Sequence, residues 1–120
     1  MAILVDIIDD DDAVRDSTQM LLESYGYKVR THASAEHFLQ KNDLDRECLL
    51  VDHHMPGMSG LDLLELLRTR GDTTPALMMT AHPDPYLAPR VSKVGAALLY
   101  KPVSEEQLVL WLSRVKKINP

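Results

Sequence analysis

The stretch "CLLVDHHMPGMSG", residues 48 to 60, joins an apolar run to a polar turn. Residues 48–51 predict a buried strand, and Asp52 follows it as a lone carboxylate. The Met-Pro-Gly sequence and the Ser-Gly pair after it are typical of a turn that leads into a helix. We therefore expect a strand, a carboxylate at its C-terminal end, and a helix that starts at Ser59.

Apolar, partly β-branched runs end at polar or turn residues five times in this chain. They predict strands at 3–8, 27–31, 48–51, 76–79 and 96–100. Segments with helical spacing separate them, and alternating strands and helices imply right-handed crossovers and a parallel sheet covered on both faces. We expect an α/β fold with strand order 2-1-3-4-5.

Helix boundaries carry their own signals. Ser34 is a predicted N-cap, and Ser104 with Gln107 predicts a capping box for the last helix. The fourth helix is expected to be short, because prolines interrupt the segment 83–89. We predict about two turns, with Pro89 as the first helical residue and a stop at Gly95. The other predicted stops are Gly26 and Gly71.

Length and composition favour one domain over residues 1–120, because 120 residues with 45% hydrophobic content can close a single core. A net charge of -5 argues against direct nucleic-acid binding by this domain. The single cysteine, Cys48, fits a reducing compartment, and no export signal or membrane-spanning stretch is evident. We expect a cytoplasmic protein whose Cys48 is a buried thiol.

Polar side chains follow four of the predicted strands. Asp9 to Asp12 follow the first strand, Asp52 the third, Thr80 the fourth and Lys101 the fifth. In the expected strand order these ends open onto one pocket, where several carboxylates require a cation. An oxygen-only cluster suits Mg²⁺, and a carboxylate beside Mg²⁺, a hydroxyl and an ammonium group is a plausible phosphoryl acceptor. Asp52 is the predicted nucleophile.

The same residues form motifs of a known family. "IIDDDDAVR", "LLVDHHMPGMSGLDLL", "LMMTAH" and "LLYKPV" resemble the acidic pair, phosphoacceptor block, strand-four Thr/Ser and Lys-Pro of response regulator receiver domains. "THASAEHFL" is similar to the NarL/FixJ-type subgroup. The resemblance covers nearly the whole chain and implies a flavodoxin-like (βα)5 fold.

The resemblance also implies roles for single residues. Asp52 would accept a phosphoryl group from a phosphohistidine on a cognate sensor histidine kinase. Asp9, Asp10, Asp52 and the backbone carbonyl of His54 would hold Mg²⁺, and Thr80 and Lys101 would bind phosphoryl oxygens. The domain would signal, by family analogy in transcriptional control through an output domain outside this sequence, rather than act as an enzyme.

Three positions bear on how such a switch is tuned. The family position three residues before the lysine usually carries Tyr or Phe, and here it is Leu98, so the output geometry is expected to differ. His54 and His82 lie two residues beyond Asp52 and Thr80 and are expected to tune phosphoryl hydrolysis. His53 and His54 lack metal-ligand spacing, and as neighbours they are expected to point apart rather than to bind zinc.

Other functions remain open from the sequence. "IIDDDDAV" also fits the opening motif of haloacid-dehalogenase-like phosphatases, with Asp10 as nucleophile and Asp12 as acid/base, although no suitable later acidic pair follows. A phosphorylation-independent interaction module with the same fold is a third interpretation. Val109 and Leu110 lie off the apolar stripe of the last helix, as ordinary partly buried residues or as a phosphorylation-dependent homodimer face.

Overall fold

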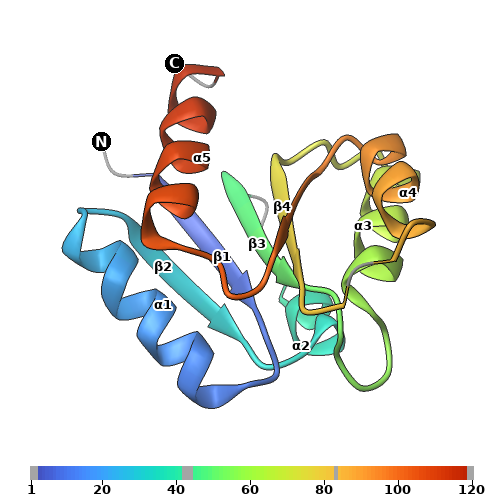
Figure 1. Cartoon of the computed structure of the whole chain (residues 1–120), viewed down its shortest axis with the longest axis horizontal. Coiled ribbons are helices and arrows are strands. Elements are labelled where there is room, and N and C mark those ends of the chain that lie inside the picture. The colour runs from blue at the N-terminus through green and yellow to red at the C-terminus, as the bar shows by residue number, and fades with distance from the viewer. Residues whose placement is uncertain (1–2, 42–44, 83, 119–120) are drawn as a thin grey trace.

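The computed structural model describes residues 3–41, 45–82 and 84–118. Strands and helices alternate along this part of the chain (Figure 1). In order they are β1 (Leu4–Ile8), α1 (Asp12–Ser24), β2 (Lys28–His32), α2 (Ala35–Gln40), β3 (Cys48–Asp52), α3 (Gly60–Thr69), β4 (Ala76–Thr80), α4 (Leu87–Lys93), β5 (Ala97–Tyr100) and α5 (Glu105–Ile118). Among the described residues, no helix has the length and apolar character needed to cross a bilayer.

The five strands form one parallel sheet in the order β2-β1-β3-β4-β5, which confirms the predicted α/β topology. The central strand β3 is buried along its whole length, as expected for an uninterrupted apolar run covered on both faces. Because all strands run the same way, their carboxyl ends meet at one edge, the lower edge in Figure 1. This edge carries the predicted site residues.

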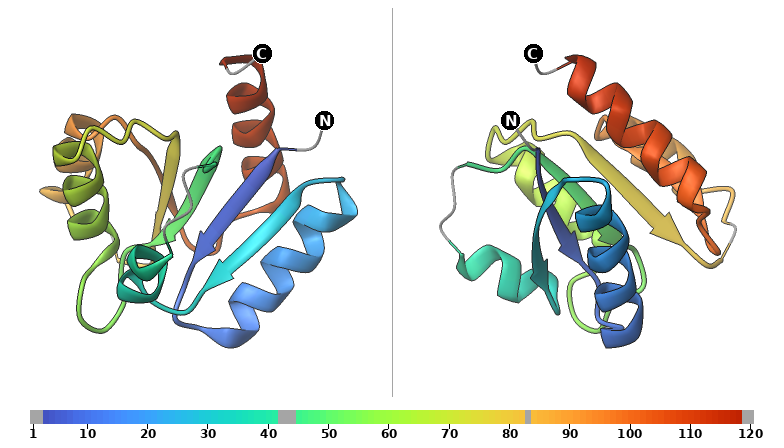
Figure 2. Two further views of the ribbon diagram at one scale, coloured as in Figure 1. Left: turned by 180° about the vertical axis from the view of Figure 1, so that it is seen from behind. Right: turned by 90° about the vertical axis from the view of Figure 1, so that its left-hand side faces the viewer.

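Two apolar clusters flank the sheet. On one face, Phe38 of α2, Leu64 of α3 and Val91 of α4 pack against alternate sheet residues. On the other face, Leu22 of α1 and Leu112 of α5 do the same. In the right-hand view of Figure 2, α1 and α5 lie on one side of the sheet and α2 on the other. The sheet is therefore the middle layer of three, with helices covering both of its faces.

The helix boundaries follow the predicted caps. The Ser34 and Ser59 hydroxyls accept the backbone N–H groups of the residues three positions on, and Ser104 and Gln107 bond each other reciprocally. Gly26 and Gly71 follow the ends of α1 and α3 with φ angles of +90° and +83°, a conformation that favours glycine.

The fourth helix is short, as predicted, but its predicted start is wrong. It spans seven residues, Leu87–Lys93, and begins two residues before Pro89. Pro89 is thus the third helical residue, where the backbone N–H has no intrahelical partner in any case, so proline removes no hydrogen bond. Gly95 lies just beyond the helix, as predicted. Pro83, part of the same prediction, lies outside the described residues.

Candidate functional site

Three carboxylates converge at the carboxyl edge of the sheet. Asp9 directly follows β1, Asp52 is the last residue of β3, and Asp10 lies beside Asp9 in the loop to α1. Asp9 and Asp52 are buried and Asp10 is exposed. One carboxylate oxygen of each lies within 4.8 Å of the others. The predicted proximity of Asp9, Asp10 and Asp52 is confirmed.

The remaining acids of the run serve other purposes. The Asp11 side chain caps α1 by accepting the Val14 N–H, and Asp12 is exposed and pairs with Arg15. Asp11 is therefore a helix cap and Asp12 a solvated residue of the helix surface. Asp12 is therefore engaged in an ion pair on the helix surface, which does not favour the acid/base role of the phosphatase-like interpretation.

Lys101 supplies the positive charge of the pocket. Its Nζ lies 2.9 Å from Asp52 Oδ1 and 3.8 Å from Asp9 Oδ2. Burial lowers the pKa of Lys101, but the Asp52 and Asp9 carboxylates outweigh burial, so the pKa is raised and the ammonium form is favoured. The backbone N–H of Lys101 donates to the Thr80 carbonyl at 2.8 Å, which anchors the lysine to the end of β4.

The carboxylates fit a divalent cation. Burial together with the Asp52 and Asp10 carboxylates raises the pKa of Asp9, although the Asp11 N–H and Lys101 act against the shift. Asp9 Oδ2 is buried and accepts no hydrogen bond from the described residues. Buried oxygen ligands with excess negative charge are what Mg²⁺ prefers, so this donor set suits Mg²⁺ better than a softer metal.

Thr80, the last residue of β4, is fully buried and faces two histidines. Its Oγ1 lies 3.2 Å from His54 Nε2 and accepts the backbone N–H of His82 at 3.3 Å. The rings of His54 and His82 meet edge to face, with centroids 4.8 Å apart. The two histidines predicted to tune phosphoryl hydrolysis are thus brought together beside Thr80.

The prediction that His53 and His54 point apart is wrong. Their ring centroids are 4.8 Å apart, because both residues lie beyond the end of β3, where the alternation of a strand no longer applies. Burial and the nearby His54 ring lower the pKa of His53, despite the Asp52 carboxylate. Among the described residues, Asp9, Asp10 and Asp52 are the one group of three or more such side chains with metal-ligand spacing, and neither histidine belongs to it.

Leu98 lies in β5, paired with Met78 of β4, and packs partly buried against the apolar cluster on the α3 and α4 face. It is not in the acidic pocket.

The backbone carbonyl of His54 remains a predicted ligand of Mg²⁺.

Two side chains that the sequence analysis did not single out support the loops of the site. Arg15 Nη1 donates to the backbone carbonyl of Asp9 at 2.8 Å. Glu36 Oε1 accepts the backbone N–H of Met58 at 3.1 Å. No local pattern signals either contact, because each depends on where a helix is placed relative to a loop.

A five-stranded parallel sheet with paired acids, a strand-end aspartate and a lysine at its carboxyl edge is the arrangement expected of a signalling receiver domain. The model of the family described as response regulator receiver domain matches residues 5–113, and the chain belongs to this family.

Several known proteins are similar to this chain. The transcriptional regulatory protein FixJ of Azorhizobium caulinodans is 47% identical over 107 residues, which cover 88% of this chain and 51% of that protein. The response regulator protein TodT of Pseudomonas putida is 36% identical, with coverage of 99% and 53%. A CheY-like receiver domain from Methanospirillum hungatei superposes with a TM-score of 0.89 at 29% identity, covering 98% of this chain and 96% of that one. The NarL/FixJ-type resemblance is confirmed, and the chain spans about half the length of the curated relatives it matches.

Proposed function

We propose that this domain accepts a phosphoryl group on Asp52 from the phosphohistidine of a cognate sensor histidine kinase. The observation that carries the proposal is the placement of Lys101 Nζ, 2.9 Å from Asp52 Oδ1 within a pocket of three carboxylates. An ammonium group and a metal at this point offset the charge of an incoming phosphoryl group.

The transfer is a substitution at phosphorus. A carboxylate oxygen of Asp52 forms the new P–O bond as the P–N bond to the kinase imidazole breaks, and the released imidazole regains a proton from solvent. Lys101 and the Thr80 hydroxyl would bind the phosphoryl oxygens. Asp9, Asp10, Asp52 and the His54 carbonyl would hold Mg²⁺, which when bound would neutralise charge on the transferred group.

Phosphoryl uptake is expected to require Mg²⁺. Incubation with acetyl phosphate and Mg²⁺ should add the mass of one phosphoryl group to the intact protein, and chelation by EDTA should abolish the addition, because Lys101 alone then faces the negative charge of three carboxylates and of the donor. Intact-mass spectrometry measures both samples. Absence of uptake from acetyl phosphate and from a phosphorylated kinase alike would contradict the proposal and favour a phosphorylation-independent interaction module.

The output is proposed from the relatives, because FixJ is a transcriptional regulatory protein and the chain matches about half of it. We infer that phosphorylation changes a surface of this domain and thereby controls transcription through an output domain. Leu98 lacks the aromatic ring usual at its position, so the surface change is proposed to differ from that of relatives with Tyr or Phe there.

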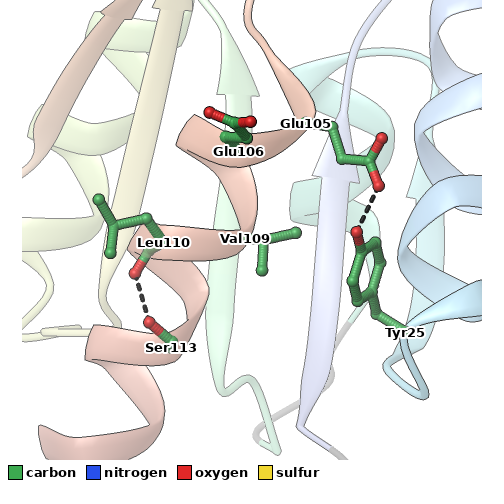
Figure 3. A pocket seen from close by; sticks show the side chains of 6 residues that line it. All are labelled: Tyr25, Glu105, Glu106, Val109, Leu110 and Ser113. Atoms are coloured by element: carbon green, nitrogen blue, oxygen red, sulfur yellow. Dashed lines mark hydrogen bonds between the residues drawn. The ribbon is translucent and has the colours of Figure 1, made fainter.

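A second copy of this domain is the proposed partner of the α5 surface. Figure 3 shows a groove between α1 and α5, in which Tyr25 donates a hydrogen bond to Glu105. Leu110 beside it is 54% exposed. In an antiparallel pair of α5 helices centred on Leu110, Glu106 of one copy would face Arg114 of the other. The phosphorylated sample of the uptake experiment should then double its mass in light scattering.

Removing the two imidazoles beside Thr80 is expected to shorten the life of the acyl phosphate. His54→Ala and His82→Ala should each speed hydrolysis by at least about threefold, because rings packed beside Thr80 would hinder the approach of water to the phosphoryl group. The decay of the phosphorylated mass after removal of acetyl phosphate gives the lifetime. His37→Ala, an exposed histidine on α2, is the control, and unchanged lifetimes in both test variants would remove the idea.

A further inference from the structure

A glutamate on α2 contacts the loop that follows the phosphoacceptor. Glu36 Oε1 accepts the backbone N–H of Met58 at 3.1 Å. The loop lies so close that a Cβ atom on Gly57 would come within 2.9 Å of the same oxygen. Gly57 also has a φ of +77°, which disfavours any other residue. The sequence at this turn therefore leaves room for the carboxylate.

The helix that carries Glu36 is held in place by its buried residues and its N-cap. Its neighbours Ala35 and Phe38 are 0% and 2% exposed, in the same apolar cluster as Met55 of the loop. The Ser34 cap fixes the start of α2. Because the helix cannot shift without disturbing this cluster, Glu36 presents its carboxylate to the loop from a defined position.

The remaining contacts hold the two ends of the loop. His53 N–H donates to the Met79 carbonyl at 2.9 Å, and Gly60 N–H donates to the His53 carbonyl at 3.1 Å. At Gly60 even a methyl group would lie 2.5 Å from the Asp52 carbonyl oxygen. Between these ends, buried Met55 and the Glu36 contact at Met58 restrain the segment that contains His54.

We propose that Glu36 is a positioning residue, which restrains the 53–59 loop so that the His54 carbonyl faces the acidic pocket. The inference rests on the proposed Mg²⁺ site, and it adds to that site a residue of α2 that touches neither metal nor phosphoryl group. Loss of a hydrogen bond that helps to orient a metal ligand commonly weakens metal binding by about 10-fold or more.

The test compares Mg²⁺ binding by Glu36→Ala and Glu36→Gln, without any phosphodonor. Gln keeps an acceptor oxygen for Met58 N–H and loses the charge, whereas Ala loses both. We expect the Mg²⁺ dissociation constant to rise about 10-fold in Ala and to stay within about twofold of wild type in Gln, as measured by amide NMR titration. Hydrogen exchange of the Met58 amide should quicken in Ala alone.

The control is Glu23→Ala, an exposed glutamate in the last turn of α1, at the opposite end of the sheet from the pocket. Equal weakening in Gln and Ala would assign the effect to charge and overturn the positioning role, as would wild-type affinity in Ala. If the wild-type protein itself binds no Mg²⁺, the metal site and this inference both fail, which is a distinct result.

Discussion

Replacing Asp52 with asparagine is expected to lower phosphoryl uptake from acetyl phosphate at least about 1,000-fold. An amide oxygen is a far weaker nucleophile than a carboxylate, and the substitution also removes one negative charge that would hold Mg²⁺. Asp52 is the last residue of β3, and its Oδ1 lies 2.9 Å from Lys101 Nζ, the ammonium group proposed to bind the incoming phosphoryl oxygens. Intact-mass spectrometry at several reaction times gives the rate for each variant.

The control for this substitution is Asp12→Asn. Its side chain is 84% exposed and pairs with Arg15 on the helix surface, so uptake should stay at the wild-type level. A phosphatase-like domain would behave differently, because it would still form its phosphorylated intermediate at Asp10 when Asp52 is replaced. Undiminished uptake by the Asp52→Asn protein, with the group mapped to Asp10, would therefore refute the receiver chemistry.

Replacing Asp6 with alanine is expected to lower the free energy of unfolding by about 3 kcal/mol. The Asp6 carboxylate is fully buried in β1, where it accepts hydrogen bonds from Arg30 Nε at 2.9 Å and Nη2 at 3.0 Å and lies 2.9 Å from His32 Nε2. Removing this carboxylate takes away the buried acceptor that Arg30 and His32 share. The expected cost is large for a domain whose total stability is typically about 5–15 kcal/mol. Urea denaturation at neutral pH measures the change.

The matched control is Asp45→Ala, because Asp45 pairs with the same Arg30 at 3.0 Å but is 73% exposed. Exposed ion pairs contribute little, so its removal should cost less than about 1 kcal/mol. Equal costs for the two variants would show that burial of the Asp6 carboxylate is not what matters.

The same carboxylate should contribute to acid sensitivity. Burial raises the pKa of Asp6, but its hydrogen bonds to His32 and Arg30 outweigh burial and hold the pKa below its ordinary value of 3.8. A depressed folded-state pKa stabilises the protein above pH 3.8, and that contribution is lost as the pH falls through the folded-state value. Urea midpoints of Asp6→Asn should therefore fall less than those of wild type on acidification through this range.

Much of the fold could be predicted from local patterns. The predicted strand at 48–51 is observed at Cys48–Asp52, and the Ser34 and Ser59 caps lie where the sequence places them. Apolar periodicity and helix capping depend on residues only a few positions apart, so the amino-acid sequence is sufficient to predict them. The predicted start of α4 at Pro89 is wrong because every position of a helix's first turn tolerates proline, and Pro89 occupies the third.

For the candidate site, the sequence is sufficient to predict which strand-end residues lie close together. Parallel strands bring Asp9, Asp52 and Lys101 to one edge whatever the details of packing, and the structure confirms that they meet. The contact between the rings of His53 and His54 could not be predicted, because beyond the end of a strand no simple period relates side-chain direction to position.

Apolar periodicity, helix caps and the order of strand-end residues are sufficient to specify the element order, the parallel sheet and the carboxylates at its edge. Packing alone decides which polar side chains meet across the fold: Asp6 with Arg30 and His32, and Glu36 with the Met58 N–H. These contacts join segments 22 to 26 residues apart. Their partners follow from strand register and from the depth at which α2 docks, and both are set by the shape of the buried core.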